Sequence, residues 1–154
     1  MTTRTKTGIA AALGAGALAL FSTTFLAHAG EAMKVYASPT CGCCAAWVRH
    51  VEEAGYDVEV EHVGMADLNA QKQQAGFTPK HSSCHTGLID GYAIEGHVPA
   101  SDIKRLLTEK PEAIGLSVPG MPADAPGMGN GDTPYDVLLV KEDGSSEVFA
   151  SYPR

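Results

Sequence analysis

Residues 33–55 of the chain read MKVYASPTCGCCAAWVRHVEEAG, and their pattern indicates a strand followed by a helix. The first six residues alternate apolar and polar side chains, which predicts a short strand over 33–38. Apolar side chains then recur at helical spacing over 45–54, and Thr40 is a suitable N-cap for a helix that ends at Gly55. Three cysteines therefore stand where a strand passes into a helix: Cys41, Cys43 and Cys44.

The segments that follow predict four further elements. They are a strand over 56–63, a short helix over 65–75, a hairpin over 86–98 that turns at Asp90-Gly91, and a helix over 101–110 with Ser101 as its N-cap. The resulting order is strand, helix, strand, helix, two strands, helix. This is the thioredoxin-like order, with the C-x-x-C sequence of Cys41–Cys44 between the first strand and its helix.

The C-terminal part of the chain adds to this unit. Residues 118–134 are rich in Gly, Pro and Met and predict a loop, whereas 136–140 and 147–152 predict a hairpin that turns at 142–144. The expected fold class is therefore α/β, a thioredoxin-like fold with an added C-terminal β-hairpin.

Residues 1–29 predict a secretory signal peptide. Arg4 and Lys6 form a positive n-region, an apolar stretch covers 9–26, and Ala27-His28-Ala29 is a small-x-small cleavage site. The alternative, a membrane anchor, is disfavoured because the stretch is rich in Ala and Gly and ends in that site. We expect cleavage after Ala29, a periplasmic location, one thioredoxin-like domain over 30–154, and no membrane association after cleavage.

The charge of the chain excludes one class of partner. The formal net charge is −7, and removal of the two basic residues of the signal segment makes the remaining domain more negative. Such a surface repels phosphates, so no nucleic acid is expected as a partner.

The four cysteines form a poor disulfide framework. An oxidising compartment makes disulfides the default interpretation of an even count. A bridge between Cys43 and Cys44 would be vicinal and strained. Two arrangements stay open: Cys41–Cys44 with Cys43–Cys84, or Cys41–Cys84 with a poor second pair.

The spacing of these cysteines suits soft-metal chemistry. Thiols at a helix N-terminus face unpaired N–H groups, so their pKa should fall, and a C-x-x-C there can exchange disulfides or bind a metal. Cys43, already inside the helix, is expected to project away from Cys41 and Cys44. Thiolate sulfurs can nevertheless bridge ions, so three clustered sulfurs plus Cys84 favour several Cu(I) ions over one Zn(II).

Other side chains could add ligands. Cys84 lies in KHSSCHT beside His85, and His97 follows in the predicted hairpin; both histidines could instead be structural hydrogen-bonding residues. Met121 and Met128 could offer thioethers, or could pack the loop onto the core. We expect the two remaining candidates, His50 and His62, to be exposed.

Several motifs together resemble the CopG-type periplasmic copper-resistance proteins. They are CGCCAAW (41–47), SCHT (83–86), GYAIEGHVP (91–99), GLSVPGMP (115–122), PGM (126–128) and PYDVLLV (134–140). The resemblance implies a thioredoxin-like fold and a role in copper tolerance, with a redox function. The ligands that it implies are Cys41, Cys43, Cys44 and Cys84. Gly129 departs from the pattern, because an acidic residue is expected after Pro-Gly-Met.

The sequence thus predicts a periplasmic copper-binding protein that holds more than one Cu(I) in a cysteine-thiolate cluster. Cu(I)/Cu(II) redox activity would make it an enzyme, a copper oxidoreductase. Copper ions and other periplasmic copper-handling proteins are the expected partners. A thiol-disulfide oxidoreductase that uses the C-x-x-C is the alternative, and a disulfide-bonded exported domain of unrelated role is the third interpretation.

Overall fold

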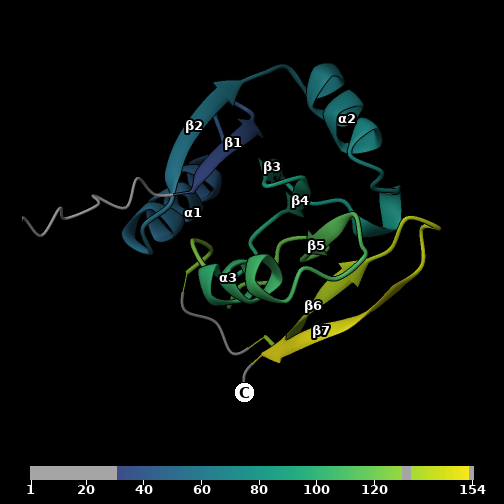
Figure 1. The fold of residues 1–154 in the computed structure, drawn as a ribbon. Coiled ribbons are helices and arrows are strands. Elements are labelled where there is room, and N and C mark those ends of the chain that lie inside the picture. The colour runs from purple at the N-terminus through teal and green to yellow at the C-terminus, as the bar shows by residue number, and fades with distance from the viewer. Residues whose placement is uncertain (1–30, 130–132, 153–154) are drawn as a thin grey trace, which may run out of the picture.

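The computed structural model describes residues 31–129 and 133–152, which form a mixed α/β fold (Figure 1). The predicted signal peptide lies outside these residues. The helices are α1 (Gly42–Glu53), α2 (Met65–Gln74), the short 3-10 helix η1 (Pro79–His81) and α3 (Ala100–Glu109). The strands are β1 (Ala32–Ala37), β2 (Asp57–His62), β3 (His85–Ile89), β4 (Tyr92–Glu95), β5 (Gly115–Ser117), β6 (Tyr135–Val140) and β7 (Ser146–Tyr152).

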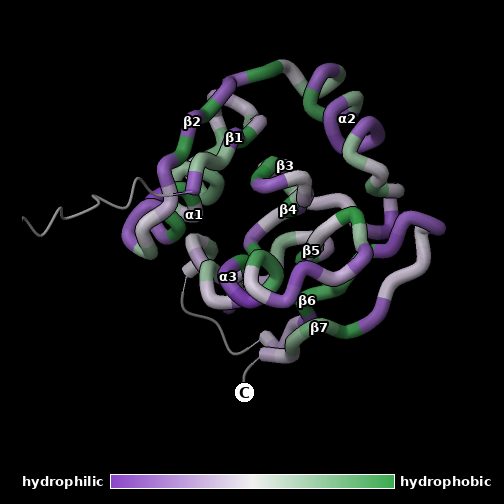
Figure 2. The backbone as a smooth tube through the Cα atoms, in the orientation of Figure 1, coloured by the Kyte–Doolittle hydropathy of each residue, from purple (hydrophilic) through white to green (hydrophobic). Residues whose placement is uncertain are grey.

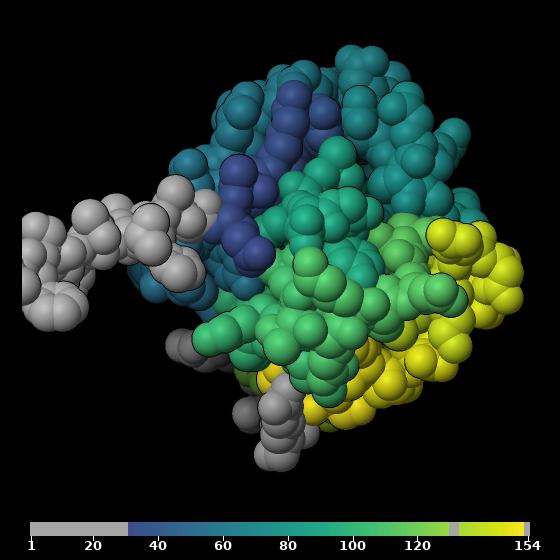
Figure 3. Space-filling model, viewed as in Figure 1, coloured from purple at the N-terminus to yellow at the C-terminus, as the bar shows by residue number. Residues whose placement is uncertain are grey.

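All seven strands belong to one sheet, in the order β2-β1-β3-β4-β5-β6-β7. The pairs β1–β2 and β4–β5 are parallel, and the other neighbours are antiparallel. Figure 1 shows β1 and β2 on one side of the molecule and the β6–β7 hairpin on the other. In the space-filling view, the C-terminal segment packs directly against the middle of the chain (Figure 3). The predicted C-terminal hairpin is confirmed.

Strand β1 lies between β2 and β3, and its alternating pattern gives it one buried face. Met33, Val35 and Ala37 are all buried, as the period of two along a strand requires. Trp47 of α1 packs into the same core and is fully buried, and its indole N–H donates to the carbonyl oxygen of Val98 at 2.8 Å. Helix α2 carries polar side chains over most of its length (Figure 2), and Leu68 and Lys72 are its only buried residues.

Two predicted helix caps are wrong. The N-cap of α1 is Cys41 rather than Thr40, and its Sγ accepts a hydrogen bond from the backbone N–H of Cys44 at 3.3 Å. The N-cap of α3 is Pro99 rather than Ser101, and it makes no side-chain cap.

His50 is half-buried, so the expectation that it is exposed is wrong. Its Nε2 accepts a hydrogen bond from the backbone N–H of Ala100 at 3.1 Å. This N–H belongs to the first turn of α3, whose amides have no partner within the helix. His50 therefore joins the end of α1 to the beginning of α3.

Strand β5 was not predicted. It is three residues long and lies just before the Gly/Pro-rich loop. Its parallel pairing with β4 and antiparallel pairing with β6 connect the C-terminal hairpin to the rest of the sheet. Within the described residues, no helix has the length and apolar character needed to cross a membrane.

Candidate metal centre

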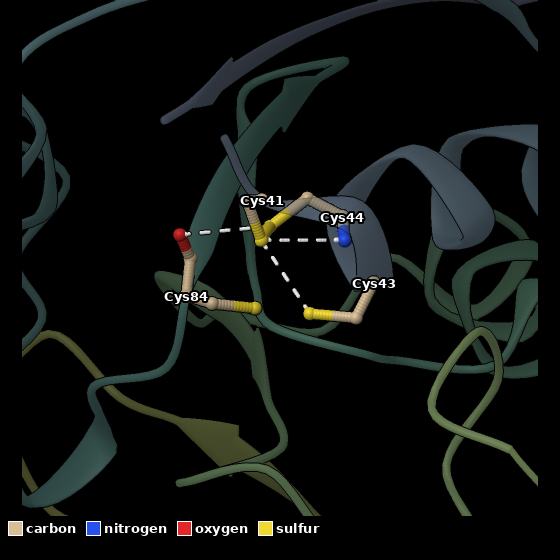
Figure 4. Close-up of side chains that lie close together, drawn as sticks. All are labelled: Cys41, Cys43, Cys44 and Cys84. Carbon is tan, nitrogen blue, oxygen red and sulfur yellow. Dashed lines mark hydrogen bonds between the residues drawn. A yellow bond between two sulfur atoms is a disulfide. The ribbon is translucent and has the colours of Figure 1, made fainter. Parts of the chain in front are cut away.

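The structure brings the four cysteines together. Cys41 caps α1, and Cys43 and Cys44 lie in its first turn. Cys84 immediately precedes β3, whose antiparallel register pairs His85 with Ala37 at the end of β1. Since α1 follows β1 closely, this register carries Cys84 to the beginning of α1 (Figure 4). The four Sγ atoms all lie within 4.8 Å of one another.

Two of the four sulfurs are bonded. Cys41 and Cys44 form a disulfide, whereas Cys43 and Cys84 are free thiols. The Cys41–Cys44 bridge belongs to the first of the two predicted arrangements, but its companion bridge Cys43–Cys84 is not formed. Reduction of one disulfide would therefore make all four sulfurs available.

Cys43 points toward the other sulfurs, so the prediction that it projects away is wrong. Its Sγ lies 3.4 Å from the Sγ of Cys41 (Figure 4). The reason is the conformation of Cys41, which lies outside the helix in extended backbone, with φ −84° and ψ 93°. This backbone turns the Cys41 side chain back over the first turn of α1, where it meets Cys43.

Cys84 is held in a partly buried place. Burial raises the pKa of its thiol to about 11, and the neighbouring Cys43 adds to the increase. The carbonyl oxygen of Cys84 lies 3.9 Å from the Sγ of Cys44. At neutral pH the metal-free residue is therefore a thiol, and a bound metal would have to displace its proton.

His97 presents a lone pair to Cys84. The Nδ1 atom of His97 lies 2.7 Å from the carbonyl oxygen of Pro126, which can only accept, so Nδ1 carries the proton. Nε2 lies 3.0 Å from the Sγ of Cys84. Burial lowers the pKa of His97, so the ring is neutral and Nε2 is free to accept a proton or bind a metal.

His85 lies on the inner side of the same cysteine. Its Nδ1 is 3.3 Å from the Sγ of Cys84, and its ring packs 4.3 Å from that of Trp47 and 5.0 Å from that of His97, measured between centroids. The side chain is fully buried, and burial lowers its pKa well below the usual value. Cys84, His85 and His97 thus form a second group of close potential ligands.

The loop after β5 covers one side of the cluster. A Cβ atom at Gly127, where φ is +82°, would lie 2.6 Å from the backbone nitrogen of Trp47 and 3.0 Å from the carbonyl oxygen of Cys43. The loop backbone thus lies directly on the first turns of α1.

Met128 packs against the core, which is one of the two roles predicted for it, whereas Met121 is 60% exposed. His62 is exposed, as predicted.

Two residues near the site were missed in the sequence. Lys72 of α2 and Glu95 of β4 form a buried ion pair, with 2.6 Å between Nζ and Oε1. A sign of it was present, because Glu95 is a charged residue inside the apolar run YAIEGHV. A buried charge in such a run needs a partner, and Lys72 lies four residues after the buried Leu68 on the same face of α2.

The donor set fits a soft metal ion. Four sulfurs meet in one small volume, and two neutral imidazoles lie beside one of them. Thiolate and imidazole ligands favour Cu(I) and Zn(II) over the hard cations that prefer oxygen. The cluster could therefore bind metal once the disulfide is reduced.

Comparisons with known proteins agree with this chemistry. Residues 81–128 match a family model described as a protein of unknown function, DUF411. A solved structure titled copper resistance protein CopG, form 2, is 43% identical, with a TM-score of 0.73, and the alignment covers 80% of this chain and 99% of that one. A second, titled form 1, is 40% identical, with a TM-score of 0.75 and coverage of 81% and 99%. The search of curated proteins found no match. With such identity over nearly the whole length of the solved chains, this chain belongs to the CopG family of copper resistance proteins.

Proposed function

We propose that the protein holds more than one Cu(I) ion in a cluster of the thiolates of Cys41, Cys43, Cys44 and Cys84, and that it serves copper tolerance in this way. The observation that carries the proposal is the meeting of four sulfurs within 4.8 Å. The names of the two solved relatives support copper as the cargo.

Several monovalent ions suit this site better than one divalent ion. The sulfurs of Cys41, the N-cap of α1, and Cys43, in its first turn, are only 3.4 Å apart, which suits ligands that are shared between ions. Thiolates can bridge soft ions, and Cu(I) accepts low coordination numbers. Burial and the neighbouring Cys43 raise the pKa of Cys84, which means that a buried thiolate beside another cysteine is unfavourable without a positive charge nearby. Four thiolates carry four negative charges, and several bound Cu(I) ions would offset more of this charge than one ion.

We also propose that the copper changes its oxidation state at this site, which would make the protein a copper oxidoreductase. Two of the four ligands can close into the Cys41–Cys44 disulfide. Because the Cu(I) cluster needs both of these sulfurs as thiolates, the disulfide can close only when the metal has left. In the loaded protein the exchanged electron is therefore that of the copper: Cu(I) gives one electron to an external one-electron acceptor and becomes Cu(II), and Cu(II) takes one electron back in the reverse step.

A thiol-disulfide oxidoreductase is the second candidate. The observation in its favour is the Cys41–Cys44 disulfide at the N-terminus of α1, and the order β2-β1-β3-β4 supports our proposal that this part of the fold is thioredoxin-like. The position of Cys43 disfavours this second candidate, because its thiol lies close to Cys41 and would compete with a substrate thiol for the Cys41 sulfur.

Export to the periplasm is part of the proposal and rests on residues 1–29. An oxidising compartment is consistent with a protein whose cysteines alternate between disulfide and metal ligands. The intact mass of periplasmic protein tests this step: processing after Ala29 is expected, and a mass that retains residues 1–29 would exclude it.

Metal analysis tests the function as a whole. Protein from copper-grown cells, purified without oxygen, should contain more than one copper per chain, and the Cys84→Ser variant should contain less. A wild-type protein that contains zinc, or no more than one copper, would reject the cluster. Insulin reduction at the rate of a dedicated thioredoxin would favour the second candidate.

A further inference from the structure

The buried ion pair between Glu95 and Lys72 lies next to the segment that carries Cys84. Glu95 is the last residue of β4 and is completely buried, and Lys72 of α2 is 5% exposed. Their contact distance is 2.6 Å. Replacing such a pair by apolar residues is often neutral or stabilising, so the demands of folding alone do not explain why it is there.

The Glu95 carboxylate holds the chain on both sides of Cys84. Its Oε1 accepts a hydrogen bond from the backbone N–H of Ser83 at 2.6 Å, and its Oε2 accepts one from the Thr86 hydroxyl at 2.6 Å. Ser83 immediately precedes the cysteine, and Thr86 follows it by two positions. Lys72 completes the arrangement, because its Nζ also donates to the Thr86 hydroxyl at 3.2 Å.

The segment that Glu95 holds has little other regular structure. Residues 82–84 lie between η1 and β3 and belong to neither. Gly120 provides a second attachment, since its N–H donates to the carbonyl oxygen of Ser82 and its own carbonyl oxygen accepts from the Ser83 hydroxyl. Segments without regular structure move more readily than strands, whereas metal ligands must be held near their productive positions.

We propose that Glu95, oriented by Lys72, is a positioning residue that holds the Ser83 amide and thereby keeps the Cys84 sulfur within reach of the other three. The inference rests on the proposed copper cluster and adds to it. A carboxylate is suited to the task because it accepts several strong hydrogen bonds at once, and burial excludes the water that would compete for them.

Two double variants separate the hydrogen bond from the ion pair. Lys72→Met with Glu95→Gln removes both charges but keeps an amide oxygen that can accept from Ser83. Lys72→Met with Glu95→Leu removes the acceptor as well. The control is Lys34→Met with Glu61→Gln, which removes an exposed pair between β1 and β2 whose contact is 2.8 Å.

The first readout is the alkylation rate of Cys84 in the metal-free, disulfide-bonded protein. We expect the Met/Leu variant to react about tenfold faster or more, because a hydrogen bond to a charged group is worth at least a factor of about ten. The Met/Gln variant and the Lys34/Glu61 control should stay near the wild-type rate. This readout is independent of copper, so it tests the positioning role even if the protein binds no copper.

The second readout is the Cu(I) stoichiometry of the reduced proteins. The Met/Leu variant should bind as few ions as Cys84→Ser, and the Met/Gln variant should bind as many as wild type. If the ion pair were purely structural, both double variants would show a changed melting temperature, but their Cu(I) stoichiometries would not differ from each other. The inference is overturned if the folded Met/Leu variant keeps the wild-type alkylation rate and stoichiometry, or if the two double variants behave alike.

Hydrogen exchange of the wild-type protein covers the case in which the Met/Leu variant does not fold. The Ser83 amide should exchange as slowly as the amides of β3, although it lies outside the strand, because Glu95 accepts its hydrogen bond. Exchange at the rate of an exposed loop amide would overturn the inference.

Discussion

The Nε2 atom of His97 lies 3.0 Å from the Sγ atom of Cys84. The hydrogen bond from Nδ1 to the carbonyl oxygen of Pro126 fixes the tautomer, so the lone pair of Nε2 points at the sulfur. In the metal-free protein this nitrogen can accept a hydrogen bond from the Cys84 thiol, and in the proposed copper-loaded protein it would be available as a ligand. The loop after β5 therefore acts on the cluster through His97.

The first prediction follows from this contact. His97→Asn keeps an N–H that can reach Pro126 but removes the nitrogen next to Cys84. Loss of such a partner typically weakens metal binding about tenfold to hundredfold. Competition with a Cu(I) chelator measures the affinity, and His62→Asn, which changes an exposed histidine of β2, is the control. Equal affinities for His97→Asn and wild type would show that His97 has no part in binding.

The second prediction concerns the contact of the loop with α1. Gly127→Ala should destabilise the protein by about 1–3 kcal/mol more than Gly144→Ala, because the new methyl group meets the backbone of Trp47 and Cys43. Gly144 has a similar φ of +78° but open space around it, so it isolates the effect of the contact. Urea unfolding measures both, and equal losses would contradict the close approach.

The third prediction concerns pH. Burial lowers the pKa of His50, and its neutral Nε2 accepts from Ala100. The pKa of His50 in the unfolded chain is close to the ordinary histidine value of 6.5, so the unfolded chain binds more protons than the folded chain between the two pKa values. The free energy of unfolding should be highest above about pH 6.5 and should decrease as the pH falls from there toward the folded pKa.

His50→Gln tests this origin of the pH dependence. Its amide oxygen can accept from Ala100 but does not titrate, so the decrease should become smaller while the stability at pH 7.5 changes by no more than about 1 kcal/mol. Nearby Glu53 acts in the opposite direction on His50 and is unchanged in the variant. Urea unfolding of metal-free protein at pH 7.5, 6.0 and 5.0 provides the comparison. If the free energy of unfolding of His50→Gln falls with pH as much as that of the wild type, the pH dependence arises from the other buried histidines.

Much of the fold follows from local patterns. Strand and helix periodicity predicted the order of the elements through α3 and the terminal hairpin. What it missed depends on long-range contacts: β5 is stabilised by its neighbours in the sheet rather than by its three residues, and Ala100 is capped by His50, which is remote in sequence. Such pairings leave no periodic trace.

The site was predictable in its members but not in its geometry. The dense cysteines of SPTCGCC and the histidines around Cys84 identified the candidate ligands that the structure brings together. The direction of Cys43 depends on the backbone angles of Cys41, which no sequence pattern specifies. The role of Glu95 depends on the fold that brings α2 over β4.

The fourth prediction concerns the oxidised, metal-free protein. Peptide mapping should find the Cys41–Cys44 bridge, with Cys43 alkylated faster than Cys84, whose thiol is partly buried and has a raised pKa. Insulin reduction should be slow, because Cys43 competes for Cys41. A bridge between Cys43 and Cys84 would contradict the arrangement of the thiols.

Titration of the fully reduced protein with Cu(I), against a competing chelator and with Cys84→Ser in parallel, tests the central claim most directly. We expect saturation above one ion per chain, a lower value for Cys84→Ser, and weaker binding of zinc than of copper. Saturation at one ion, or tighter binding of zinc, would contradict a multi-copper thiolate cluster.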